Sequence, residues 1–395
     1  MLSAQSICDS AGIQCCVKLF WTACPDNTFE HYTLYRSDAP GVDNNTNSTT
    51  LLSEICTVAE TTYTDSTVSL DKTYYYRIET HNVHSGTTWS NEAAVAVFVR
   101  DYPYRVTHTV TMEWYPHFLC AHPSGETIYG TVKNNNLVFT INTATFTIDD
   151  TIPAGEGPLG ITVRPSGNSI YVVNFSSGTI SVIQHATTTV IDTITIEGTA
   201  KGIAAHPNDT EVYVPVFTRK KVAQINASNN QIVSNTDVIG SPRHIGILPG
   251  GEYLYVTNCN SDSVAVIRTA DNTVVAWIPV GGFSKGIAVL PDGSYVYIAN
   301  PWDEKVTVVR TSDNSVATTI PVAGHPRDCD VLPDGSYVYV TNLSYNHVSV
   351  IDTRTNTVVE KIPVSGVSKG IAVLPDGRTV YVTDLSNGAV SVLGY

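Results

Sequence analysis

From residue 117 to its end, the chain is built on a repeat of fixed length. Proline recurs every 42 residues, at Pro123, Pro165, Pro207, Pro249, Pro291, Pro333 and Pro375, and tyrosine keeps the same spacing from Tyr129 to Tyr381. Each unit holds four short apolar runs; in the unit 285–326 they are 286–290, 295–300, 305–310 and 315–322. A period of about 40 to 45 residues with four strands per unit is typical of propeller blades. The repeat therefore predicts a β-propeller.

The number of blades follows from the way the repeat ends. Six complete units cover residues 117–368, and the last, from Lys369 to Tyr395, holds three of the four strands. The fourth is found upstream, because RVTHTVTMEWYP aligns with TIDDTIPAGEGP and places Pro116 in register with Pro158. We therefore expect residues 105–112 to complete the last blade and close a ring of seven, which leaves no exposed sheet edge.

The first hundred residues carry a different pattern. Short alternating runs at 17–21, 31–36, 73–79 and 93–99 are separated by turn-rich pieces, which predicts an antiparallel sandwich. The segments VKLFW (with Trp21), YTLYRSD, TYYYRIETHN and SNEAAVAV resemble strands of a fibronectin type III domain. The chain is thus expected to be all-β, with a fibronectin type III-like sandwich over 1–100 and the propeller over 101–395.

Five of the eight cysteines lie in this first region, at Cys8, Cys15, Cys16, Cys24 and Cys56. Such crowding is not typical of fibronectin domains and indicates an oxidising compartment, with added disulfides or bridges between chains. Cys120, Cys259 and Cys329 are dispersed in the repeats and are expected to be small buried apolar residues.

The repeats also resemble a named family. The motif YVTN at 255–258 and 339–342, with IPV and LPDG around it, is similar to the YVTN family of β-propellers over residues 105–395. That resemblance implies an exported or surface-layer protein of archaea or bacteria. The first and third repeats depart from the motif, with YGTV at 129–132 and YVPV at 213–216, so we expect those blades to be reshaped for contact.

Charge and hydropathy exclude some partners. A net charge of −14 argues against nucleic-acid binding, and no apolar run is long enough for membrane insertion. The opening MLSAQSICDS is not an intact secretory signal, so a signal has been removed or another export route is used. Four Asn-x-Ser/Thr triplets in predicted turns, at Asn44, Asn47, Asn208 and Asn226, are glycosylation candidates and favour an extracellular or cell-surface location.

One set of equivalent positions carries most of the candidate chemistry. In a propeller, the residues just before the innermost strands surround the central channel. Here they are His117, Leu159, Lys201, Arg243, Lys285, Arg327 and Lys369. Together with the nearby Trp302, this ring predicts a site for an anionic ligand such as an acidic glycan. The alternative is a solvated surface inherited with the repeat.

The sixth repeat reads Asp328-Cys329-Asp330 where others read Gly-Ile-Ala, and it follows His325. Two carboxylates and a histidine can hold a metal ion. Pairing of Asp328 with Arg327 or another cation of the ring is the favoured interpretation. His122 and His206 are expected on the opposite face in structural roles.

Three functions remain open. The leading hypothesis is a non-enzymatic structural or adhesive protein of a cell surface, sheath or filament, which self-associates through protein contacts. The second is an anion-binding module on the basic face. The third is a propeller lyase or hydrolase, although no HExxH motif or phosphate-binding glycine loop is present and the residues of metal-dependent propeller lyases cannot be mapped onto this chain.

Overall fold

A computed structural model describes residues 105–394 without a break and, before them, the segments 2–8, 15–21, 29–37, 49–55, 62–66, 72–82, 86–89 and 93–97. Contacts divide the chain into two compact units, Met1–Tyr102 and Pro103–Tyr395. Within the described part, no helix has the length and apolar character needed to cross a membrane.

The first unit contains two antiparallel sheets. One has the strand order β1-β2-β5, and the other has the order β4-β3-β6-β7, with β8 also pairing with β6. The strands are β1 (Leu2–Cys8), β2 (Cys15–Trp21), β3 (Phe29–Ser37), β4 (Thr49–Ile55), β5 (Thr62–Asp65), β6 (Lys72–Asn82), β7 (Gly86–Trp89) and β8 (Ala93–Val97).

Aromatic side chains form much of the described core of this unit. Trp21 packs edge-on against Tyr32, with 5.5 Å between ring centroids, and both are buried. Buried Asp65 accepts hydrogen bonds from the Tyr76 hydroxyl at 3.0 Å and from Arg36 at 2.8 Å, so its charge is compensated.

Some predictions for this unit are not tested. Cys24, Cys56, Asn44 and Asn47 lie outside the described residues. The backbone register places Cys8 opposite Cys15 on β1 and β2. The cysteine pairing stays a prediction.

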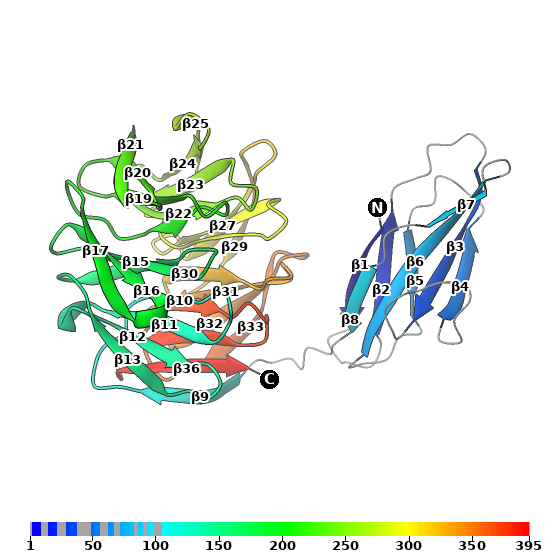
Figure 1. The fold of residues 1–395 in the computed structure, drawn as a ribbon, viewed down its shortest axis with the longest axis horizontal. Helices are drawn as coiled ribbons and strands as arrows, with labels where there is room; N and C mark the ends of the chain where they lie inside the picture. The colour runs from blue at the N-terminus through cyan, green and yellow to red at the C-terminus, as the bar shows by residue number, and fades with distance from the viewer. Residues whose placement is uncertain are drawn as a thin grey trace. The chain divides into compact units, whose positions relative to one another are not determined.

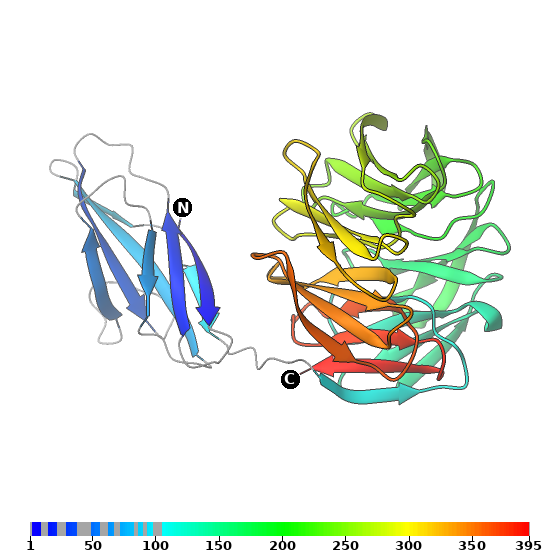
Figure 2. The same cartoon turned by 180° about the vertical axis from the view of Figure 1, so that it is seen from behind.

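The second unit is a seven-bladed all-β propeller, which confirms the fold predicted from the repeat (Figure 1, Figure 2). Every blade is a four-stranded antiparallel meander. From the innermost strand outward, the first blade contains β10 (Leu119–Ala121), β11 (Thr127–Val132), β12 (Leu137–Asn142) and β13 (Ile148–Pro153), the second contains β14 (Pro158–Val163), β15 (Ser169–Asn174), β16 (Thr179–Gln184) and β17 (Thr189–Thr195), and the third contains β18 (Ala204–Ala205), β19 (Glu211–Val216), β20 (Lys221–Asn226) and β21 (Gln231–Asp237). The fourth contains β22 (Pro242–Ile247), β23 (Tyr253–Asn258), β24 (Ser263–Arg268) and β25 (Thr273–Pro279), and the fifth contains β26 (Ile287–Val289), β27 (Tyr295–Asn300), β28 (Lys305–Arg310) and β29 (Ser315–Pro321). The sixth contains β30 (Pro326–Val331), β31 (Tyr337–Asn342), β32 (His347–Asp352) and β33 (Thr357–Pro363), and the seventh contains β34 (Ser368–Val373), β35 (Val380–Asp384), β36 (Ala389–Gly394) and β9 (Arg105–Thr111). Two short 3₁₀ turns, η1 (Lys133–Asn135) and η2 (His185–Thr187), join strands in the first two blades.

The closure strand lies where the register predicted it. β9 pairs with β36, with Val110 opposite Val390, and the two strands run side by side in Figure 1. Val110 is buried with Val390 and with Leu119 of the first blade. The start and end of the propeller sequence are therefore held in one sheet.

The repeated tyrosines explain much of the period. All seven are almost fully buried. Three of them donate a hydrogen bond to an asparagine in the outer turn of the next blade: Tyr171 to Asn230 (2.6 Å), Tyr255 to Asn314 (2.6 Å) and Tyr297 to Asn356 (2.7 Å). These asparagines have φ values of 53° to 57°, a left-handed conformation that asparagine tolerates better than most residues. One residue type thus fixes both the turn and the contact between blades.

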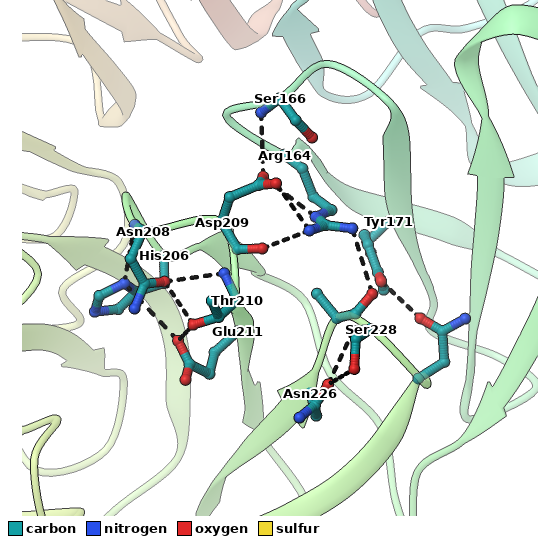
Figure 3. Close-up of polar contacts among 12 residues, drawn as sticks. Arg164, Ser166, Tyr171, His206, Asn208, Asp209, Thr210, Glu211, Asn226 and Ser228 are labelled. Atoms are coloured by element: carbon teal, nitrogen blue, oxygen red, sulfur yellow. Dashed lines mark hydrogen bonds and ion pairs between the residues drawn. The ribbon is translucent and has the colours of Figure 1, made fainter.

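Further polar contacts join neighbouring blades, and Figure 3 shows those between the second and third blades. The Arg164 guanidinium donates to both carboxylate oxygens of Asp209, at 3.2 and 2.8 Å, and the Ser166 amide donates to the same carboxylate (Figure 3). His122 and His206 place Nε2 3.0 and 2.8 Å from the carbonyl oxygens of Gly167 and Gly251 in the following blades. Both histidines are therefore structural, as the sequence predicted.

We expect Tyr255→Phe to lower the free energy of unfolding of the propeller by about 1 kcal/mol, because it removes the hydrogen bond to Asn314 and leaves the ring in place. Urea denaturation measures the change. Tyr345→Phe is the matched control, because the Tyr345 side chain is 60% exposed and should tolerate the loss of its hydroxyl. Equal effects of the two changes would contradict a role for the Tyr–Asn contact.

Candidate functional site

The candidate site is a cavity of about 190 Å³ that we call the channel mouth. Its lining residues are His117, Phe118, Lys133, Leu159, Phe175, Lys201, Arg243, Arg327 and Lys369. Most lie at or just before the start of an innermost strand, where the repeat brings equivalent positions of successive blades together. The structure thus gathers His117 and four of the predicted cations around one cavity.

Close packing of the innermost strands draws these positions together. Glycine follows the ring position in four blades, at Gly160, Gly202, Gly286 and Gly370. A Cβ atom on Gly202 would lie 2.6 Å from the Arg243 carbonyl oxygen, so the backbones approach too closely for a side chain. The other three blades carry Phe118, His244 and Asp328 at this position. The rings of Phe118 and His244 come from the first and fourth blades and lie 5.5 Å apart, so both reach into the channel.

Aromatic faces alternate with the cations. Lys201 Nζ lies 5.2 Å from the Phe175 ring centroid and 4.5 Å from that of Phe217. Lys369 Nζ lies 5.1 Å from the Phe118 ring and Lys133 Nζ lies 5.5 Å from the Phe175 ring. These contacts partly replace water around each ammonium group without neutralising its charge.

Lys285 and Trp302, the other two predicted ligand-binding residues, lie beside this cavity and share one aromatic partner. Lys285 is buried, with Nζ 4.9 Å from the Phe283 ring. Trp302 stacks on Phe283, with 4.3 Å between centroids, and is 68% exposed. Arg243 approaches the same Phe283 ring at 5.8 Å, which links both residues to the mouth.

The electrostatics of the mouth are one-sided. No acidic side chain is among its lining residues, and within residues 105–394 none of its lysines or arginines forms an ion pair. Burial and the neighbouring cations lower the pKa of Lys201 to about 8, of Lys285 to about 7 and of Lys369 to about 6. Burial, together with Lys369, also lowers the pKa of His117 to about 4. Burial and mutual repulsion therefore disfavour the positive charges of the mouth.

Over the part of the chain that the structure describes, three nitrogens at or beside the mouth have no hydrogen-bond partner. They are Nε of Arg243, Nε of Arg327 and Nε2 of His244. The Arg243 side chain is more than nine-tenths buried, and one of its terminal nitrogens contacts only the Cys259 sulfur at 3.6 Å. Buried donors left unpaired are costly, so an acceptor bound here would recover that free energy.

The sixth blade differs from one prediction. His325 does not join Asp328 and Asp330, because its exposed ring lies 3.0 Å from Ser344 Oγ and 3.8 Å from Glu304 Oε1. Over the described residues, no group of three or more His, Cys, Asp or Glu side chains is placed to hold a metal ion. His325, Asp328 and Asp330, the alternative set of metal ligands, are therefore not gathered into one cluster.

The two aspartates instead join neighbouring blades. The Asp330 carboxylate accepts a hydrogen bond from the Val373 amide of the seventh blade at 2.8 Å. Asp328 forms no direct ion pair with Arg327, so the pairing favoured from the sequence is not found. Burial raises the pKa of Asp328 to about 7 and the pKa of Asp330 to about 6. Burial thus makes both carboxyl groups easier to protonate than an ordinary aspartate.

The dispersed cysteines and the remaining sequons are placed as follows. Cys259 and Cys329 are buried, Cys120 is partly buried, and all three are free thiols. Asn208 is exposed and Asn226 is partly exposed; each side chain accepts hydrogen bonds from the Thr or Ser two residues later. Nothing in the structure tests their glycosylation.

Sequence reasoning missed two contributors to the mouth. Lys133 occupies the same repeat position as Phe175 and Phe217, so the internal alignment contained the signal for it. Phe118 stands where most repeats have glycine, and such a departure from the repeat marks a side chain that enters the channel.

Comparisons with known proteins support the fold and give a partial family match. A family model described as "Lactonase, 7-bladed beta-propeller" matches residues 241–362. Kuenenia stuttgartiensis hydrazine synthase superposes with a TM-score of 0.67 at 19% identity, covering 72% of this chain and 97% of that one. The Cps50 (Swd1) β-propeller domain of Myceliophteria thermophila gives 0.66 at 9% identity, covering 74% and 100%. No curated protein matches the chain.

Proposed function

We propose that the propeller is a binding domain for an acidic carbohydrate, whose anionic group enters the channel mouth. The observation that carries the proposal is the set of unpaired cations around one cavity, with buried guanidinium nitrogens that lack acceptors. A carboxylate accepts from arginine in a planar, charge-assisted geometry that satisfies those nitrogens. This was the second of the three functions left open by the sequence.

Exposed aromatic rings favour a sugar as the rest of the ligand. Trp302 and Tyr345, which are 68% and 60% exposed, lie in turns that connect the second and third strands of adjacent blades. Those turns share the face of the mouth, since Lys133 and Phe175 lie in the equivalent turns. The faces of such large aromatic rings that stay open to water are suited to stacking against the apolar face of a sugar ring.

The setting we propose is a cell-surface or extracellular protein that contacts other subunits. The YVTN-like motifs support it. So do the strand orders β1-β2-β5 and β4-β3-β6-β7, with β8 also pairing with β6, because such pairing is expected of a fibronectin type III-like sandwich. In this proposal the carbohydrate site serves adhesion, and the crowded N-terminal cysteines and the sequons belong to an exported chain.

Titration of the full chain with an oligogalacturonate, followed by calorimetry, tests the proposal. We expect binding that weakens with added salt, and a loss of affinity of at least about tenfold in Arg243→Gln, because a charge-assisted hydrogen bond is removed. Lys220→Gln is the matched control, since Lys220 is an exposed cation outside the lining residues. Equal affinity for a neutral oligosaccharide, or no binding at all, would end the proposal.

A hydrolase is the second candidate because the lactonase-type match includes two mouth residues, Arg243 and Arg327, and the neighbouring Asp328. With a pKa of about 7, Asp328 is suited to act as a general base on water, and the nearby cations can stabilise a developing oxyanion. A panel of lactones assayed with wild type and Asp328→Asn tests this. Absence of turnover by the wild-type protein would leave the candidate without support.

A further inference from the structure

Resting on the proposed function, we infer that the charged group of the ligand sits in the throat of the channel, against Arg243, Arg327 and His244, and that it is taken up together with protons. The throat is defined here by Phe118, Arg243, His244, Arg327 and Asp328. Neither the position of this charge nor the accompanying protons follow from anion binding alone.

The unpaired donors place the charge in the throat. Among residues 105–394, Nε of Arg243 and Nε of Arg327 lack acceptors, and Nε2 of His244, which donates when it carries a proton, lacks a hydrogen-bond partner. His244 meets Phe118 from across the channel. The outer turns around the mouth, which we call the rim, carry Trp302 and His325. Their side chains already have partners, because Trp302 is stacked on Phe283 and His325 contacts Ser344. A carboxylate in the throat satisfies nitrogens that nothing else in residues 105–394 reaches, whereas a carboxylate on the rim leaves them unpaired.

The direction of proton transfer follows from the groups that face the site. The titratable ones are His117, Lys133, Lys201, His244, Cys259, Lys285, Asp328, Asp330 and Lys369, and the permanent charges are Arg243 and Arg327. A negative ligand stabilises the protonated form of a lysine or a histidine by attraction. It stabilises the protonated form of an aspartate or a cysteine by repelling the negative form. Every group therefore shifts toward proton binding, and none opposes it.

The free site has protons to gain at neutral pH. Burial and like charge hold the pKa of Lys369 at about 6 and that of Lys285 at about 7, so both are largely uncharged near pH 7.5. Asp328, with a pKa of about 7, is then mostly ionised. Binding should therefore weaken as the pH rises from 6 to 9, by up to about tenfold per pH unit for each proton taken up.

The experiment is calorimetric titration of the full chain with digalacturonate at pH 7.5, in two buffers of different ionisation enthalpy and equal chloride concentration. We expect the observed enthalpy to change with the buffer in the sense of net proton uptake, by about half a proton or more per ligand. The second arm compares Arg243→Lys with Lys220→Arg. Arg243→Lys keeps the positive charge but loses the planar set of guanidinium donors, including Nε. The affinity of this variant for digalacturonate should therefore fall at least about tenfold, whereas that of the control should not change.

The outcomes separate the two proposals. Absence of digalacturonate binding overturns the proposed function itself. Binding with no proton uptake, or with proton release, overturns the proton coupling and leaves the function standing. Unchanged affinity in Arg243→Lys overturns the placement of the ligand's charged group in the throat. A ligand bound at the rim would be held by positive charge alone, which lysine also supplies. Since the proton count is measured on the wild-type protein, it does not depend on any variant folding.

Discussion

Val110→Asp is expected to lower the free energy of unfolding of the propeller by about 3–5 kcal/mol, the loss typical of a charge forced into an apolar core. Val110 lies on the closure strand β9, where it is buried with Val390 and Leu119. An aspartate here must either carry an unpaired charge among these side chains or pull β9 away from β36. Either result weakens the closure of the ring, which depends on the pairing of strands from the two ends of the propeller sequence.

Thermal and urea denaturation of the variant measure this loss, and Thr109→Asp is its matched control. Thr109 is the neighbouring residue on β9, and its side chain is exposed on the outer strand of the blade. The same charge placed one residue earlier should therefore change the free energy of unfolding little. If both variants unfolded alike, general intolerance of β9 to charge would explain the result, and the buried packing of Val110 would not.

The fold was open to prediction because each blade repeats the same few physical constraints. The tyrosine position fills the same space between blades seven times, and its hydroxyl reaches the next outer turn in the three contacts described for Tyr171, Tyr255 and Tyr297. A requirement repeated in this way leaves a period in the sequence. The closure strand was predictable for the same reason, because β9 must satisfy the same pairing as the outer strands of the other six blades.

The site was predictable only in part, because its function depends on departures from the repeat. The ring positions around Arg243 follow from equivalence, and the structure gathers them. The direction in which a non-repeating side chain points does not follow from equivalence. His325 adopts φ of 58° in its turn and contacts Glu304, away from Asp328. Phe118 and His244 meet across the channel from different blades, a contact that no local pattern records.

The carboxylates of the sixth blade lead to the second large effect. Asp328→Asn is expected to raise the free energy of unfolding at pH 8 by about 1–3 kcal/mol and to leave it unchanged at pH 4. Burial, followed by the nearby Asp330, raises the pKa of Asp328 to about 7 from its usual value of 3.8. Between about pH 4 and 7 the folded protein therefore binds more protons at this site than the unfolded chain, so stability falls as the pH rises through this window. Asparagine is neutral at every pH and removes that loss.

The lysines at and beside the mouth change the free energy of unfolding with pH in the opposite direction from Asp328, which decides how the measurement is made. The folded-state pKa values of Lys201, Lys285 and Lys369 lie below the usual 10.5, so their contribution to stability rises with pH above about 6. Wild type and variant must therefore be compared at each pH, where most of the lysine contribution cancels in the difference. Asp303→Asn is the control: Asp303 is paired with Lys305 at 3.0 Å and its pKa is lowered, so its loss should not stabilise the protein. If Asp328→Asn were less stable than wild type at pH 8, attraction between Asp328 and the cations of the mouth would outweigh the cost of its burial, and the carboxylate would be a counter-ion that any anionic ligand has to displace.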